Sequence, residues 1–194
     1  MSQLWLPHAV ACPVPDVAGL SYVEDYLSMD EERLLIERID REPWSSDWQR
    51  RRQVYGLSYG STRPSAEATA LPGWLAPLCA RLVRDGWLER EVANAVINEY
   101  LPGQGISAHR DQPGFGPTVA ALSLGAPYVL DLFDPSGPDR AKRSIDLKPR
   151  SLLVLGGLAR SHWLHGIARR QADQVGGARR PRGRRISVTL RTRA

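Results

Sequence analysis

Two histidines and one aspartate have the residue types and the spacing of a metal site. His109 and Asp111 are two residues apart, so both side chains point to the same face if this segment is a β-strand. His165 lies much further along the chain. Two imidazoles and one carboxylate on one face leave the other positions of an octahedral metal open, as in non-heme Fe(II) oxygenases. The sequence therefore predicts that these three residues, the metal-ligand set, bind one metal ion.

His162 competes with His165 for the third ligand position. If residues 161–167 form a strand, the two imidazoles point to opposite faces, so only one of them can face the site. We favour His165 because Gly166 beside it leaves room for a metal. An isolated His-x-Asp is more often an ordinary surface pair, but three of the four histidines of this chain fall in two predicted strands.

A second pattern of period two occupies residues 185–191. The polar set is Arg185, Ser187, Thr189 and Arg191, and the apolar set is Ile186, Val188 and Leu190. The apolar set must pack on a core, so the polar set faces either water or an interior cavity. Guanidinium groups in a cavity of low dielectric need anionic partners. A dicarboxylate co-substrate would supply two carboxylates, each suited to a bidentate arginine.

Aromatic and arginine side chains mix in residues 44–60, and such a mixture suits stacked bases and phosphates. The alternative is a strand whose aromatic side chains are simply core, with arginines on the wet face. The candidate substrate contacts in this segment and near the metal-ligand set are Trp48, Arg51, Arg52, Tyr55, Tyr59, Arg110 and Phe115.

The elements that must position these residues are two helices followed by several short strands. Ser28 and Glu31 form a capping box for an amphipathic helix over residues 29–41. Pro72 begins a second helix at its first position, and Gly86 ends it. Strands are expected near residues 93–100, 117–124, 127–133, 144–147, 151–156, 161–167 and 184–191. Residues 169–183 are polar and Gly-rich, which predicts an exposed loop.

This pattern predicts a mainly β fold of the α+β class. The expected architecture is a double-stranded β-helix, a jelly-roll or cupin-like pair of sheets, with the two N-terminal helices backing one sheet. A chain of 194 residues is enough for one large core, so we expect a single domain over residues 1–194. Within it, residues 43–90 are expected to form a substrate-recognition lid with its supporting helix, and residues 91–194 the β-helix core.

Composition sets the broad class. Two cysteines, Cys12 and Cys79, indicate no disulfide framework and fit a reducing cytosol, so a cytoplasmic monomer is expected. No signal peptide and no bilayer-length apolar run is evident, so no membrane partner is expected. The net charge of +5 comes from arginines at residues 50–52 and in the last quarter of the chain. These either attract a polyanion or form a solvated surface.

Four motifs together resemble the AlkB family of Fe(II)- and 2-oxoglutarate-dependent dioxygenases. They occur in the family's order across residues 43–191: Asn98-x-Tyr100-x-Pro102-Gly103, His109-x-Asp111, His165-Gly-Ile167 and Arg185-x-Ser-x-Thr-x-Arg191. Each motif alone is weak, and their joint occurrence is specific. The resemblance implies Fe(II), 2-oxoglutarate and O2 as cofactors and co-substrates, with iron on the metal-ligand set. It implies 2-oxoglutarate contacts at Asn98, Tyr100, Arg185 and Arg191, with Ser187 where asparagine is common.

The resemblance further implies oxidative dealkylation of N-alkylated bases in DNA or RNA, with a base flipped out or presented unpaired. The expected partner is alkylated single-stranded DNA or RNA. One departure bears on the substrate: Pro113 stands where the best-known bacterial members have a second acidic residue that touches the base. The same chemistry on a protein, lipid or small molecule is therefore the alternative. A catalytically silent nucleic-acid-binding module is a third hypothesis, which the intact ligands and both arginines oppose.

Overall fold

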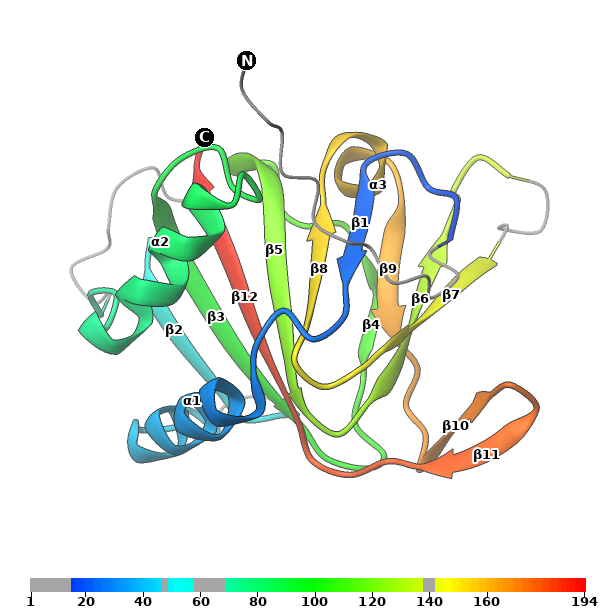
Figure 1. The fold of residues 1–194 in the computed structure, drawn as a ribbon. Coiled ribbons are helices and arrows are strands. Elements are labelled where there is room, and N and C mark those ends of the chain that lie inside the picture. Colours follow the sequence, from blue (N-terminus) through cyan, green and yellow to red (C-terminus); the bar gives the residue numbers. More distant parts are fainter. Residues whose placement is uncertain (1–14, 47–48, 58–68, 138–141) are drawn as a thin grey trace, which may run out of the picture.

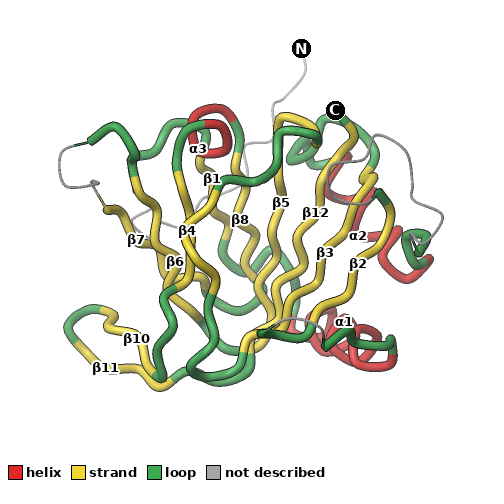
Figure 2. The backbone as a smooth tube through the Cα atoms, turned by 180° about the vertical axis from the view of Figure 1, so that it is seen from behind, coloured by secondary structure: helices red, strands yellow, loops and turns green. Residues whose placement is uncertain are grey.

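A computed structural model describes residues 15–46, 49–57, 69–137 and 142–194, and it contains two antiparallel sheets that face each other (Figures 1 and 2). The larger sheet has the strand order β1 (Leu20–Val23), β8 (Ser151–Leu155), β5 (Phe115–Gly125), β12 (Arg185–Arg193), β3 (Val92–Tyr100), β2 (Arg52–Gly56). The smaller sheet has the order β4 (Ile106–His109), β9 (Leu164–Ile167), β6 (Tyr128–Phe133), β7 (Lys142–Leu147). This is the predicted double-stranded β-helix, and it places a space between two inner faces.

Helices cover the outer face of the larger sheet, as Figure 1 shows. They are α1 (Met29–Arg41), the short 3-10 helix η1 (Gly73–Leu75) and α2 (Ala76–Arg84). The capping box of Ser28 and Glu31 is present at the start of α1, and the helix has the predicted bounds. Pro72 differs from its prediction, because it is the N-cap of η1 rather than the first residue of an α-helix.

Strand alternation divides each central strand between a packed face and a cavity face. Ile186, Val188 and Leu190 of β12 lie in a buried cluster with side chains of α1, η1 and α2. Their neighbours Arg185 and Arg191 therefore point to the opposite face, between the sheets. Burial of the apolar set against the helices is what turns the guanidinium groups inward, as the period-two pattern predicted.

The connections differ most from the predictions. The predicted strand over residues 161–167 is wrong in its first half, because α3 (Gly157–Ser161) precedes the short strand β9. Residues 169–183 are largely exposed, as predicted, but they do not form a loop. They contain a hairpin of β10 (Ala172–Val175) and β11 (Ala178–Pro181), near whose base Asp173 and Arg182 are buried. No helix within the described ranges is long and apolar enough to cross a membrane.

Candidate metal and co-substrate site

A cavity of about 810 Å³ lies between the sheets. Its walls come from β2, β3, β5, β8 and β12 on one side and from β4, β6, β7 and β9 on the other. The volume is within the range of small-molecule and cofactor pockets. The inner faces of both sheets therefore converge on one site.

The metal-ligand set lies together at one end of this cavity. His109 is the last residue of β4 and faces His165 of β9 across the strand pair, with ring centroids 4.5 Å apart. Asp111 follows β4 by two residues, and its Oδ2 is 3.5 Å from His165 Nε2. The prediction that His109 and Asp111 share one strand is wrong, because β4 ends at His109 and Asp111 reaches the site from the following loop.

Arg191 holds the carboxylate of Asp111. Its Nη2 and Nε donate to Asp111 Oδ1 at 2.5 and 3.1 Å, while its Nη1 donates to Asn94 Oδ1 at 3.0 Å. Burial raises the pKa of Asp111, but the charge and the hydrogen bonds of Arg191 outweigh it, so the pKa lies below its usual value. Asp111 is therefore an ionised carboxylate with Oδ2 directed towards His165.

The two imidazoles are suited to bind a metal ion. Burial lowers the pKa of His165 to about 4, so the ring is neutral near pH 7, which is the form that binds metals. The Nδ1 atom of His109 lies 2.9 Å from the carbonyl oxygen of Ser107. This contact favours a proton on Nδ1 and leaves the lone pair of Nε2 for a ligand bond.

The donor set fits Fe(II), although it is not a closed cage. Within the described ranges, no three His, Cys, Asp or Glu side chains already stand in a complete metal-binding arrangement. The neutral imidazole of His165, the ionised carboxylate of Asp111 and the second imidazole of His109 nevertheless share one cavity wall. The nitrogen of His165 that faces Asp111 is Nε2, at 3.5 Å from Oδ2. Two imidazoles and one carboxylate are the donors of the facial triad.

Arg160 fixes the loop that carries Asp111. This buried side chain of α3 donates to the backbone carbonyl oxygens of Asp111, Gln112, Phe115 and Gly116, at distances of 2.8 to 3.4 Å. A single guanidinium therefore closes the loop between β4 and β5. No sequence pattern predicted a role for Arg160, because backbone acceptors leave no signature in the sequence.

The opposite end of the cavity contains an arginine without an anionic partner. Arg185 is 2% exposed, and its Nη2 donates to Ser123 Oγ at 2.8 Å. Its Nε and Nη1 atoms have no hydrogen-bond partner among the described residues. Burial lowers the pKa of this guanidinium. Two unsatisfied donors on a buried cation are the arrangement that a carboxylate would complete.

Asn98, Tyr100 and Ser187 surround Arg185. Strand pairing places Tyr100 opposite Arg185 and Asn98 opposite Ser187, so all four side chains share the cavity face. The guanidinium carbon of Arg185 lies 5.3 Å from the ring centroid of Tyr100 and 6.0 Å from that of Tyr128. The structure thus brings the four residues that the sequence assigned to 2-oxoglutarate at this end into one pocket, while Arg191 stands beside the metal-ligand set.

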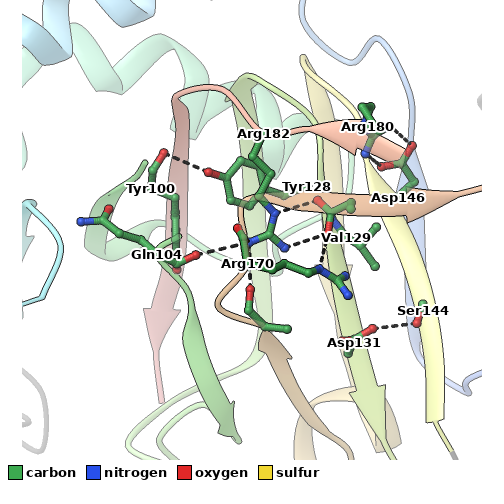
Figure 3. Close-up of polar contacts among 12 residues, drawn as sticks. Tyr100, Gln104, Tyr128, Val129, Asp131, Ser144, Asp146, Arg170, Arg180 and Arg182 are labelled. Carbon is green, nitrogen blue, oxygen red and sulfur yellow. Dashed lines mark hydrogen bonds and ion pairs between the residues drawn. The ribbon is translucent and has the colours of Figure 1, made fainter. Parts of the chain in front are cut away.

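A buried ion pair, with Arg182 as its labelled partner in Figure 3, packs against Tyr128 beside this pocket. Arg182 donates to both carboxylate oxygens of Asp173 at 2.8 Å, and neither side chain is exposed. Arg170 adds a bond to Asp173 at 2.7 Å, which completes the group that we call the hairpin clamp: Arg170, Asp173 and Arg182. The guanidinium carbon of Arg182 lies 4.2 Å from the ring centroid of Tyr128. The base of the β10–β11 hairpin thereby packs against one wall of the Arg185 pocket.

The candidate substrate contacts divide into several groups. Arg52 lines the cavity. Arg51, directly before β2, pairs with Glu99, and Tyr55 of β2 is in the core beneath the helices, so neither side chain lines the cavity. Trp48 and Tyr59 lie outside the described residues.

The other two candidates stand outside the cavity lining. Arg110 is exposed and donates to the carbonyl oxygen of Ser161 at 3.4 Å. Phe115 is buried beneath Arg191, with its ring centroid 5.6 Å from the guanidinium carbon. Phe115 is therefore a support for Arg191 rather than a surface for a base.

Two expectations about the histidine segment have different outcomes. His162 does not line the cavity, and its Nε2 lies 3.0 Å from Asp134 Oδ1 on the protein surface, so His165 is the histidine beside Asp111. Gly166 was expected to leave room for a metal, and this is wrong. A Cβ atom there would meet the backbone of β4, with the nitrogen of Ala108 at 2.9 Å. The glycine instead permits close approach of β4 and β9.

Known proteins resemble the chain over most of its length. The family model of the 2OG-Fe(II) oxygenase superfamily matches residues 43–191. The uncharacterized protein L905 of Acanthamoeba polyphaga mimivirus is 32% identical over 177 residues, which cover 89% of this chain and 84% of that protein. The probable RNA/DNA demethylase ALKBH6 of Danio rerio is 32% identical over 199 residues, covering 88% and 83%.

A longer relative and a solved structure complete the comparison. The tRNA (carboxymethyluridine(34)-5-O)-methyltransferase ALKBH8 of Macaca fascicularis is 33% identical over 173 residues, but the chain spans only 25% of its length. The structure of OsALKBH1 superposes with a TM-score of 0.68 at 18% identity, over 90% of this chain and 98% of that one. The structural likeness shows a shared fold.

Proposed function

Because the chain belongs to the AlkB family within the 2OG-Fe(II) oxygenase superfamily, we propose that it removes alkyl groups oxidatively from bases of DNA or RNA. The proposal is carried by one observation. The metal-ligand set and a buried arginine with unsatisfied donors occupy two ends of the same cavity. The similarity to ALKBH6 of Danio rerio, a probable RNA/DNA demethylase, supports the substrate class.

Each wall of the cavity has a part in this reaction. His109, Asp111 and His165 would hold Fe(II). Arg185 would bind the far carboxylate of 2-oxoglutarate through its unsatisfied Nε and Nη1 atoms, with Asn98, Tyr100 and Ser187 beside it. Bound Fe(II), with 2-oxoglutarate and O2, supplies hydroxylation of a substrate C–H bond, and hydroxylation of an N-linked alkyl carbon releases an aldehyde and the free amine.

Arg191 would keep Asp111 ionised and oriented while the apolar walls of the cavity exclude water. Hydrogen bonds from a buried guanidinium fix one carboxylate oxygen, so the other is available to the metal. We further propose that residues 43–90 contribute the substrate side of the domain and residues 91–194 the catalytic core. A monomer in the cytosol stays a prediction from the composition.

The test is a screen of N-methylated DNA and RNA oligonucleotides with Fe(II), 2-oxoglutarate and O2, read by loss of the methyl group in mass spectra. We expect demethylation with matching succinate release, and we expect His109→Ala to abolish both. Demethylation that survives this substitution would contradict the metal assignment. Succinate release with no demethylated oligonucleotide would favour the alternative class of protein, lipid or small-molecule substrates, for which Pro113 is the sequence argument.

A further inference from the structure

Asn94 of β3 is a buried carboxamide next to the metal-ligand set. It is paired across the larger sheet with Arg191 of β12 on one side and with Gly56 of β2 on the other. Its side chain is 0% exposed, and it is not among the residues that line the cavity. Asn94 can therefore act on the site only through a neighbouring residue.

The polar groups of this carboxamide have partners whose chemistry fixes its orientation. Its Oδ1 accepts a hydrogen bond from Arg191 Nη1 at 3.0 Å. Its Nδ2 donates to the carbonyl oxygens of Leu57 at 2.8 Å and Tyr55 at 3.3 Å. A guanidinium can only donate and a carbonyl oxygen can only accept, so the amide has one possible orientation. An apolar side chain of similar size would lose all three bonds.

The bond to Asn94 completes the restraint of the Arg191 guanidinium. Its Nε and Nη2 donate to Asp111 Oδ1 on one edge, and its Nη1 is held by Asn94 on another. Because the guanidinium is planar and its donors form a rigid fork, partners on two edges oppose rotation of the whole group. Without Asn94 the fork could turn, and the carboxylate of Asp111 would turn with it. The direction of Asp111 Oδ2 towards His165 therefore depends on this restraint.

The backbone at the end of β2 fixes the carbonyl oxygens that anchor Asn94. Gly56 has a φ of +76°, and a Cβ atom there would clash with the carbonyl oxygen of Ala93. The amide of Leu57 donates to that same oxygen at 2.8 Å. The register of β3 against β12 also shifts directly after the pair of Asn94 and Arg191. Such irregularities re-aim side chains near active sites, which fits a strand end shaped to present one amide.

A second buried carboxamide, Gln53 of β2, provides a structural comparison. It is 4% exposed, and its Nε2 donates to the carbonyl oxygens of Ile39 at 2.8 Å and Glu42 at 3.3 Å. Its Oε1 accepts from the hydroxyl of Tyr55 at 3.2 Å. Both carboxamides tie two backbone carbonyls to the sheet, but the oxygen of Gln53 meets a hydroxyl of the core, whereas that of Asn94 meets a guanidinium of the site.

We propose that Asn94 is a positioning residue for the metal ligand Asp111 and that it acts through Arg191. The inference rests on the proposed function, because it takes Asp111 as a ligand of Fe(II). It predicts that loss of the carboxamide weakens metal binding, although Asn94 lies outside the cavity lining.

The test is calorimetric titration of the metal-free, full-length protein with Mn(II). We expect Asn94→Leu to lower the affinity about tenfold, at the lower end of what loss of an outer contact costs. Gln53→Leu is the matched control, because it removes a buried carboxamide with the same number of bonds on the far face of the sheet. We expect similar losses of thermal stability in both variants and an unchanged Mn(II) affinity in Gln53→Leu. If Asn94→Leu does not fold, Asn94→Ser gives the same comparison, since its side chain is too short to join both partners.

A double-mutant cycle tests whether the effect passes through Arg191. In an Arg191→Leu background, we expect Asn94→Leu to cause less than about a twofold further loss of Mn(II) affinity, because the guanidinium that it restrains is absent. Losses that multiply in the double variant would overturn the route through Arg191. Equal affinities of the wild type and Asn94→Leu, or an equal loss in Gln53→Leu, would overturn the positioning role itself.

Steady-state kinetics gives a second measurement. We expect Asn94→Leu to lower kcat for succinate release while KM for 2-oxoglutarate stays within about twofold, because the Arg185 pocket at the other end of the cavity is unchanged. A raised KM with an unchanged kcat would assign Asn94 to the co-substrate and overturn the proposal. Mn(II) binding needs no oligonucleotide, so failed positioning and failed demethylation are separate outcomes.

Discussion

Arg185 is a buried cation with two unsatisfied donors, so its environment favours a carboxylate as ligand. Replacement by glutamine removes charge-assisted bonds from a site that is otherwise enclosed by Tyr100 and Tyr128. Such bonds contribute about 1.5–3 kcal/mol, so we predict a rise in KM for 2-oxoglutarate of about 10- to 150-fold. Titration of succinate release against 2-oxoglutarate measures it. An unchanged KM would mean that the far carboxylate binds elsewhere.

Arg160 is predicted to affect metal binding without touching the metal. Its bonds to four backbone carbonyls hold the loop of Asp111, and loss of such outer contacts typically lowers metal affinity about 10- to 100-fold. We expect this loss in Arg160→Gln, measured by calorimetric titration with Mn(II) in place of Fe(II). The exposed Arg169 is the control residue, and Arg169→Gln should bind as the wild type does. Equal affinity in both variants would remove Arg160 from this role.

Among single residues, the sequence predicted the orientation of those side chains that belong to a regular alternation of polar and apolar residues. The alternation of residues 185–191 led to the cavity-facing arginines, because the apolar set has only one core to pack on. It did not reveal that Arg51 faces away from the cavity while Arg50 faces it. That outcome depends on where β2 begins to pair with β3, which no spacing within the segment specifies.

The β10–β11 hairpin is an element whose stability rests on one buried carboxylate. In Asp173→Asn, the guanidinium groups of Arg170 and Arg182 would lose their shared anion in the interior. Breaking a buried pair in this way costs about 3–5 kcal/mol of unfolding free energy. Urea denaturation measures this loss, and Glu37→Gln, which breaks an exposed pair with Arg33, should change it by less than about 1 kcal/mol. Similar losses in both variants would place the hairpin clamp outside the stable core.

Elements with local signals were predicted best. Helix α1 has its capping box, an apolar stripe and Pro43 after it, and each of these acts within the segment itself. Strands β4 and β9 have four residues each, and β10 and β11 are polar, so neither length nor hydrophobic alternation marks them. Strands β4 and β9 are far apart in the sequence and meet only in the folded chain. The hairpin of β10 and β11 is tied at its base by the buried pair of Asp173 and Arg182, which no hydrophobic pattern encodes.

For the molecule as a whole, many arginines of the last quarter serve the structure. Arg180 pairs with Asp146, and Arg182 is buried with Asp173. Arg184 bridges Asp40 of α1 and Glu99 of β3. No pattern in the sequence indicates this bridge, because the two carboxylates are far from Arg184 along the chain. The positive balance of the composition is therefore a weak guide to a polyanion surface.

The ion pairs of Glu99 with Arg51 and Arg184 predict that the stability of the fold is sensitive to acid. The hydrogen bond from Arg51, with the bonds from Arg184, lowers the pKa of Glu99 below its usual 4.5. Since the unfolded chain then binds the proton more readily, the contribution is complete above about pH 4.5 and is lost as the pH falls below it. We predict that urea denaturation will give a free-energy difference between the wild type and Glu99→Gln that is largest near neutral pH. It should shrink as the pH falls below about 4.5, and a difference independent of pH would contradict the assignment.

The missing side chain at Gly166 has a consequence for judging relatives of this protein. A single methyl group there would act as a wedge against Ala108 and Ile106, forcing β4 from β9 and His109 from His165. Such a chain would retain both histidines, the aspartate and both arginines of the motif, yet its imidazoles would no longer share a centre. An inventory of ligands is thus a poor criterion for separating working enzymes from silent homologues, unless the glycine that sets their separation is counted with them.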